Sequence, residues 1–144
     1  MPEDGSISLM IPGEPKGKQR PRFSRATGRT YTPEQTISFE NYVKALYYAS
    51  YQDRKIDGPV RAAIQAVFSL PASMSEKRKK ALDGMPYTKK SDADNLAKII
   101  LDALNGLAYA DDKQVTELTV SKRYGRVPHT LVVLAPVPLE AVPF

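Results

Sequence analysis

The sequence predicts a single domain of the α/β (α+β) class, residues 1–144, in which a small mixed sheet packs against two main helices. The length of 144 residues suits one domain with one hydrophobic core. Apolar residues recur at strand and helix spacing in the order β-α-β-(α)-α-β-β. Prolines are absent from 34–58, 60–70 and 87–127, and regular elements belong in those gaps because proline removes a donor and fixes φ.

The first strand and the first helix flank a long polar segment. Apolar residues alternate over 7–11 and predict a short strand that ends at Pro12. Residues 13–31 contain Gly, Pro, Lys and Arg with almost no apolar side chain, so we expect a long basic loop. A helix should follow from about 33 to 52, with Thr32 as its cap.

The second half of the chain contains the clearest periodic patterns. Apolar residues alternate over 60–70 and predict a strand. A charged insertion, 72–90, follows and includes a short helix near 73–80. Apolar residues at helical spacing predict the second major helix over 93–105. Two strands near 114–124 and 129–136 complete the sheet, and 137–144 form a tail.

Composition and charge exclude several classes of function. The chain has no cysteine, which excludes disulfides, zinc–thiolate sites, iron–sulfur clusters and cysteine nucleophiles. No apolar run is long enough to span a membrane and the N-terminus is unlike a signal peptide, so we expect a cytoplasmic protein. No glycine-rich phosphate loop is present, so we expect no nucleotide cofactor. The net charge of +5 suits a nucleic-acid partner, but it also fits general solubility.

The densest polar cluster lies at the start of the second helix. Asp92 and Asp94 stand in or next to its first turn, Lys98 lies one turn further on, and Asp111 and Asp112 precede the next strand. If that strand packs beside the helix, one of the later acids can approach the first pair. Three neighbouring carboxylates repel each other unless a cation intervenes, and their oxygens suit Mg²⁺ or Mn²⁺. Such an ion activates a water for attack on a phosphodiester, and the ammonium of Lys98 would neutralise charge in the transition state.

A structural interpretation of the same residues is also open. Aspartate at a helix N-terminus is ordinary capping and dipole chemistry, which would account for Asp92. Asp94 with Lys98 fits an ordinary surface ion pair, and Asp111-Asp112 fits a solvated loop. The spacing alone does not decide between these interpretations.

The basic segment within 13–31 is a second candidate site. Its six basic residues fall in fourteen positions with no acid among them, and Phe23 and Tyr31 interleave. Guanidinium groups bind phosphate in a bidentate manner and an aromatic ring stacks on an unpaired base, although a solvated charge run is the alternative. With the two lysines that precede Asp92, the candidate DNA-binding residues are Lys16, Lys18, Arg20, Arg22, Arg25, Arg29, Lys89 and Lys90.

One stretch of the sequence resembles a family signature. DADNLAKIILDALNGLAYADDKQV, residues 92–115, is similar to the signature of the RusA-type Holliday-junction resolvases, small endodeoxyribonucleases of bacteria and their prophages. That pattern is D-x-D-N, a lysine four residues after the second Asp, D-A-L and then D-D. Upstream, RPRF (20–23) and YTP (31–33) resemble the branch found in Gram-positive bacteria and phages. The resemblance covers roughly residues 7–135.

The resemblance implies an activity, a partner and a site. It implies a Mg²⁺-dependent nuclease, with Mn²⁺ as a substitute, that resolves four-way junctions and related branched DNA by paired hydrolysis in a homodimer. It implies Asp92, Asp94 and Asp112 as catalytic, metal-binding aspartates and Lys98 as the essential lysine, and it leaves Asp111 open as the third ligand. A non-catalytic DNA-binding module that uses the basic segment is the alternative, and a structural α/β domain is a further one.

Overall fold

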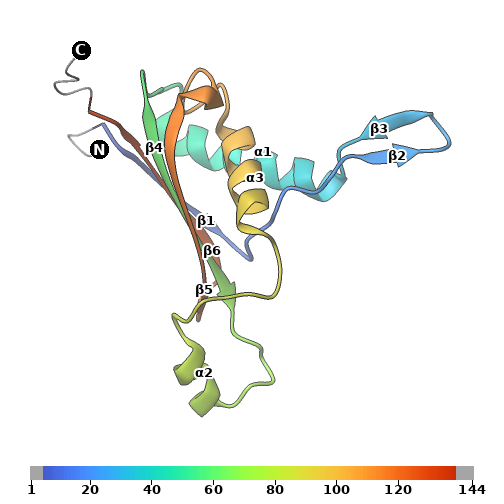
Figure 1. Ribbon diagram of the computed structural model, residues 1–144, viewed down its shortest axis with the longest axis vertical. Coiled ribbons are helices and arrows are strands. Elements are labelled where there is room, and N and C mark those ends of the chain that lie inside the picture. Colours follow the sequence, from blue (N-terminus) through green and yellow to red (C-terminus); the bar gives the residue numbers. More distant parts are fainter. Residues whose placement is uncertain (1–4, 139–144) are drawn as a thin grey trace.

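The centre of the fold is a four-stranded mixed sheet with two helices across one of its faces (Figure 1). The computed structural model describes residues 5–138, so most of the predicted tail lies outside the described residues. The strands lie in the order β1-β6-β4-β5; β4 and β5 are parallel and the other neighbours are antiparallel. The expected α+β class with a mixed sheet is therefore confirmed. The strands are β1 Ile7–Pro12, β4 Val60–Ser69, β5 Val115–Gly125 and β6 His129–Pro136.

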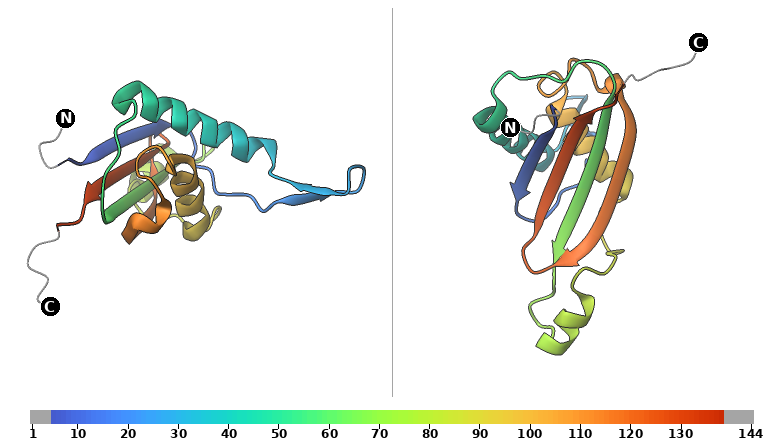
Figure 2. Two further views of the ribbon diagram at one scale, coloured as in Figure 1. Left: turned by 90° about the horizontal axis from the view of Figure 1, so that it is seen from above. Right: turned by 90° about the vertical axis from the view of Figure 1, so that its left-hand side faces the viewer.

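The helices α1 Glu34–Tyr51 and α3 Ala93–Leu104 cover the same face of the sheet (Figure 2). The short helix α2 Glu76–Leu82 buries no residue and lies apart, at one end of the sheet (Figure 1). Among the described residues, none of the helices combines the length and the apolarity needed to cross a membrane. The core lies between the sheet and the two larger helices; its largest members are Tyr47, Tyr109, Ile7, Ile11, Ile64, Leu96, Ile99, Ile100 and Leu104.

The alternation seen in the sequence becomes the two faces of the sheet. In β1, Ile7, Leu9 and Ile11 are buried under the helices, whereas Ser8 and Met10 point to the open face. Side chains alternate because successive residues of a strand point to opposite faces. Each fully buried leucine or isoleucine contributes about 1.5–3 kcal/mol, so the buried stripes fix how the sheet and helices pack.

The N-terminus of α1 differs from the prediction. The helix begins at Glu34, with Pro33 in the N-cap position and no side chain capping it, so the prediction of Thr32 as the cap was wrong. Pro33 is still extended, which leaves Thr32 one residue too early to cap. The carbonyl of Pro33 accepts the N–H groups of Thr36 and Ile37, and these backbone bonds start the helix.

The segment 13–31, predicted as a loop, contains a β-hairpin. Strands β2 Arg22–Ser24 and β3 Arg29–Tyr31 form a separate two-stranded sheet that projects from the body (Figures 1 and 2). We refer to residues 20–31 as the arm. Its turn is closed by Gly28, which donates its N–H to the carbonyl of Ser24 at 2.9 Å and has a φ of 68°. The hairpin buries no face against a core, so it lacks the apolar alternation by which strands are recognised.

Candidate active site

Two acids stand at the N-terminal end of α3. Asp92 occupies the N-cap position, but its side chain makes no capping hydrogen bond, and Asp94 lies in the first turn. Both residues are exposed, and neither carboxylate forms a hydrogen bond or an ion pair within residues 5–138. The capping interpretation is therefore not realised at Asp92, and both carboxylates are open to an external ligand.

Lys98 lies one helical turn from Asp94 and is also exposed. No ion pair joins Lys98 to Asp94 in the described part of the chain, so the ordinary surface pair is not formed either. Residues four apart on a helix face the same side. The ammonium of Lys98 is consequently held on the same side of α3 as the carboxylate of Asp94.

The second pair of acids lies at the opposite end of α3. Asn105 caps the C-terminus of the helix, and its side-chain oxygen accepts the backbone N–H of Asp112 at 3.2 Å. Asp111 caps the 3-10 helix η1 Asp112–Gln114: its carboxylate accepts the N–H of Lys113 at 2.9 Å, and Gln114 completes the capping box. The carboxylate of Asp112 makes no hydrogen bond or ion pair among the described residues. The carboxylate of Asp111 therefore caps the 3-10 helix, whereas that of Asp112 has no such role.

The two pairs of acids do not meet within one chain. The twelve residues of α3 span about 18 Å, and they separate Asp92 from Asp112. Within residues 5–138, no three acidic or histidine side chains lie close enough together to hold a metal ion. The connection after α3 leads through the 3-10 helix into β5, and the hydrogen bond from the N–H of Asp112 to Asn105 keeps this second pair of acids at the C-terminal end of α3. The convergence expected from the sequence does not occur inside a single chain.

Lys18 anchors the basic segment to both helices. Its Nζ lies 2.8 Å from Oε2 of Glu40 in α1 and 3.3 Å from Oδ2 of Asp102 in α3, and its side chain is 18% exposed. Its backbone N–H also donates to the carbonyl of Asn95 at 2.9 Å. Burial alone would lower the pKa of Lys18, but the hydrogen bonds and charges of Glu40 and Asp102 outweigh it and raise the pKa. Lys18 is thus engaged inside the protein.

The remaining basic candidates are placed differently from Lys18. All are exposed, and none of their side chains forms an ion pair with the described part of the chain. Four of them belong to the arm, two line a pocket beside the first turns of α1 and α3, and Lys89 precedes Lys90 in the sequence. They are Lys16, Arg20, Arg22, Arg25, Arg29, Lys89 and Lys90.

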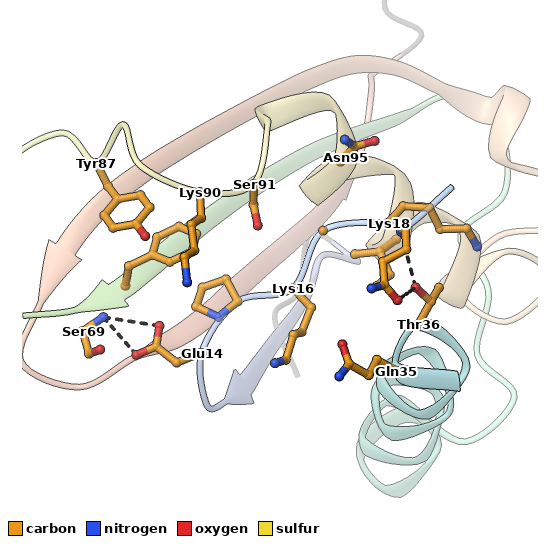
Figure 3. Close-up of a pocket in the computed structure, with 15 residues that line it drawn as sticks. Glu14, Lys16, Lys18, Gln35, Thr36, Ser69, Tyr87, Lys90, Ser91 and Asn95 are labelled. Carbon is orange, nitrogen blue, oxygen red and sulfur yellow. Dashed lines mark hydrogen bonds between the residues drawn. The ribbon is translucent and has the colours of Figure 1, made fainter. Parts of the chain in front are cut away.

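A polar pocket of about 660 Å³ lies beside the N-terminal end of α3 (Figure 3). Lys16 and Lys90 contribute to its lining, and Ser91 and Asn95 bring it to the first turn of α3. The segment at Gly17 packs closely here, because a Cβ on Gly17 would lie 3.3 Å from the Cβ of Asn95. Nothing in the sequence indicated this pocket, because its lining residues are far apart along the chain.

The backbone beside the pocket is unusual at Ser91. This residue adopts a φ of 60°, a left-handed conformation that non-glycine residues rarely take. Such strain concentrates at functional sites, where the surrounding structure holds it in place. The conformation of Ser91 turns the chain sharply between Lys90 and the N-cap residue Asp92. The residue that carries the ammonium and the residue that carries the carboxylate therefore flank one bend.

Unpaired carboxylates beside a lysine, together with a projecting cationic arm, fit a protein that processes nucleic acids by phosphodiester chemistry. The family model described as "Endodeoxyribonuclease RusA" matches residues 12–135. The chain is also 35% identical over 134 residues to a protein of Bacillus subtilis (strain 168) named "Uncharacterized protein YqaN", which covers 89% of this chain and 94% of the relative. This chain therefore belongs to the RusA endodeoxyribonuclease family.

Membership of the family confirms the resemblance noted in the sequence. The family comprises endodeoxyribonucleases that resolve Holliday junctions, so this chain is an enzyme of that class. The family binds branched DNA and its nucleases depend on divalent metal ions in general. The matched residues include the arm, both pairs of acids and Lys98.

Proposed function

We propose that this chain is a Mg²⁺-dependent, structure-selective endodeoxyribonuclease that resolves four-way junctions and related branched DNA as a homodimer, with Mn²⁺ as a substitute. One observation carries the proposal. Asp92, Asp94 and Asp112 lie in the stretch that resembles the signature of this endodeoxyribonuclease family, and within residues 5–138 their carboxylates form no hydrogen bond or ion pair.

The donor set fits a hard divalent cation. Carboxylate oxygens are the ligands that Mg²⁺ and Mn²⁺ prefer, and Asp92 and Asp94 offer them within one turn of an exposed helix end. A bound ion would polarise the phosphodiester and lower the pKa of a water. We assign Asp112 as the third acid, because the carboxylate of Asp111 is already engaged in capping.

The distance along α3 supports a dimer. One chain cannot bring Asp112 to Asp92, but two copies with antiparallel α3 helices would place the N-terminal end of one helix beside the C-terminal end of the other. Closed two-fold symmetry of this kind gives two equal sites, which suits paired cuts in a four-way junction. Each site would combine Asp92 and Asp94 with the partner subunit's Asp112.

An exposed apolar side chain beside α3 supports the same arrangement. Leu118 pairs with Ala62 in the parallel β4–β5 register, so both point to the face that α1 and α3 cover. Ala62 is fully buried there, whereas Leu118 remains 47% exposed. A second copy packed along α3 would cover Leu118.

The other residues bind and orient the DNA. Lys98 is placed to neutralise charge on the phosphate at the acids, on the same side of α3 as Asp94. Lys16 and Lys90 line the pocket beside α3 and would bind the backbone of the strand that leads to the acids. The ammonium of Lys18 is already paired with Glu40 and Asp102, so this residue would act by holding the base of the arm to the two helices and not by contacting DNA.

Complementation between two inactive variants tests the shared site. Asp94→Asn and Asp112→Asn should each abolish cutting of a labelled four-way junction. When the two variants are mixed and allowed to exchange subunits, each heterodimer has one site with both changes and one site with neither. The mixture should therefore nick one strand of the junction and not resolve it.

The negative outcomes are equally specific. If every acid came from one chain, each subunit of the heterodimer would be inactive and mixing would restore nothing. If the unchanged protein bound the junction but cut it at no concentration of Mg²⁺ or Mn²⁺, the non-catalytic DNA-binding module would be the better description.

A further inference from the structure

We propose that the arm carries Phe23 to the branch point of the DNA, where the ring stacks on bases that have lost a stacked neighbour. The inference rests on the proposed function, because it assumes branched DNA as the substrate. It adds a residue that would distinguish a branch point from a linear duplex.

The arm has no partner within the described chain that explains its shape. Its strands β2 and β3 pair only with each other, and all their residues except Ser24 are exposed. An isolated two-stranded hairpin is only marginally stable in water. The arm nevertheless projects away from the sheet and the helices (Figures 1 and 2), where its side chains are presented to a ligand.

The positive charge of the arm indicates the kind of ligand that it binds. Four arginines and no acid lie in the arm, and within residues 5–138 none of these arginines forms an ion pair. The arm therefore complements a polyanion, and a two-stranded ribbon fits the major groove of DNA. The same charge opposes contact between two arms of a dimer, because like charges repel. The arginines are Arg20, Arg22, Arg25 and Arg29.

The strand register separates the arginines from the phenyl ring. Arg22 pairs with Tyr31, and the next pair is Phe23 with Thr30, so the two pairs point to opposite faces of the ribbon. Arg29, paired with Ser24, lies on the same face as Arg22. One face therefore carries two guanidinium groups and a phenol, and the other presents Phe23 with only Thr30 directly across from it.

The chemistry of the ring then indicates what it contacts. Phe23 is 63% exposed and has no polar group with which to bind a phosphate or a base edge. Stacking on an unpaired or unstacked base is the contact with nucleic acid that favours such a ring. A linear duplex offers no free base face along its length, whereas a branch point interrupts the stack. Phe23 would thus contribute to junction binding and not to duplex binding.

Binding without metal tests the inference, because it does not depend on catalysis. A four-way junction and a linear duplex of the same arm sequence would be titrated in EDTA with the unchanged protein, with Phe23→Ala and with Phe23→Trp. Phe23→Ala should lose about 5- to 150-fold in junction affinity, the contribution of one stacked base. Its duplex affinity should stay within about twofold, and Phe23→Trp should retain junction binding.

Two further measurements make the test specific. The fluorescence of 2-aminopurine at the branch point should change when the unchanged protein binds and should not change with Phe23→Ala. Val127, an apolar residue that is 69% exposed in the turn between β5 and β6, provides the matched control: Val127→Ala should leave both affinities unchanged. The melting temperature should not change with Phe23→Ala, because the arm has no contact with the core.

Three results would overturn the inference alone. They are equal losses on junction and duplex, no loss on either, and a Phe23→Ala protein that becomes a monomer, which would mean that the arm holds a second subunit. An unchanged protein that does not prefer the junction to the duplex would instead overturn the proposed function, and this inference with it.

Discussion

The arm and helix α3 both carry charged candidate site residues, yet the rest of the protein holds these two regions in opposite ways. In α3, Leu96, Ile99 and Ile100 are buried against the sheet, so the exposed residues of the helix have fixed positions. Within residues 5–138, the hydrogen bonds of the arm are all internal, and its base is tied to the helices by Lys18 and by Gln19, which bonds to Thr36 of α1. The packed helix α3 suits catalytic groups that must be placed with ångström precision. The projecting arm suits binding to a ligand whose shape varies.

The largest effect is expected at α3. Asp94→Asn removes one negative oxygen and keeps the shape of the side chain, so cutting of a four-way junction should fall at least about 1,000-fold. Binding without metal should be unchanged or tighter, because a carboxylate repels phosphate. Single-turnover cleavage and anisotropy would measure the two quantities. A loss of binding that accompanied the loss of cutting would show that Asp94 supports the fold.

The arm should show the reverse pattern. Replacing Arg22 and Arg29 together by alanine removes two cations from one face of the ribbon. Affinity for every DNA should fall, and the slope of log K against log salt should flatten by about 2, since each phosphate contact contributes about 0.9. Thermal stability should not change. If the slope stayed the same, the arm would lie outside the DNA interface.

Much of the fold, and less of the site, could be predicted from the sequence. The strand over 60–69 and the helix over 93–104 were recognisable because each buries one regular face. The hairpin of the arm was not, because a ribbon without a buried face has no apolar period. The acids were identified by type and spacing, and the helix predicted over 93–105 already lay between the two pairs. The sequence did not show that Asn105 holds the backbone of Asp112 at the far end of that helix, and the pocket beside α3 depends on tertiary packing alone.

The contact that joins the two regions is expected to have an intermediate effect. Lys18→Met keeps the aliphatic stem but removes the ion pairs to Glu40 and Asp102. It should cost about 1 kcal/mol of unfolding free energy and weaken junction binding several-fold through a less fixed arm. Urea unfolding and anisotropy would measure both. Glu40→Gln is the matched variant, because it changes the other partner of the ion pair. If the variants lowered stability without weakening junction binding, the ion pairs of Lys18 would not be what positions the arm.

The pKa of Lys18 sets the pH range in which this contact operates. Its pKa is raised in the folded protein, so the stabilisation is complete below the ordinary value of 10.5 and is lost as the pH rises through the higher folded value. The difference in unfolding free energy between the unchanged protein and Lys18→Met should therefore be constant from pH 7 to 9. A difference that disappeared within that range would mean that Lys18 is not paired as the structure shows.

The smallest effect is expected at Asp111, and its contrast with the neighbouring Asp112 tests which of the two acids binds the metal. Asparagine caps a helix about as well as aspartate, so Asp111→Asn should keep the hydrogen bond to the N–H of Lys113 and the melting temperature. Cutting should stay within about threefold of the unchanged protein, whereas Asp112→Asn, one residue on, should abolish it. If Asp111→Asn abolished cutting and Asp112→Asn did not, the metal-binding acid would be Asp111, and its capping contact would have to break when the ion binds.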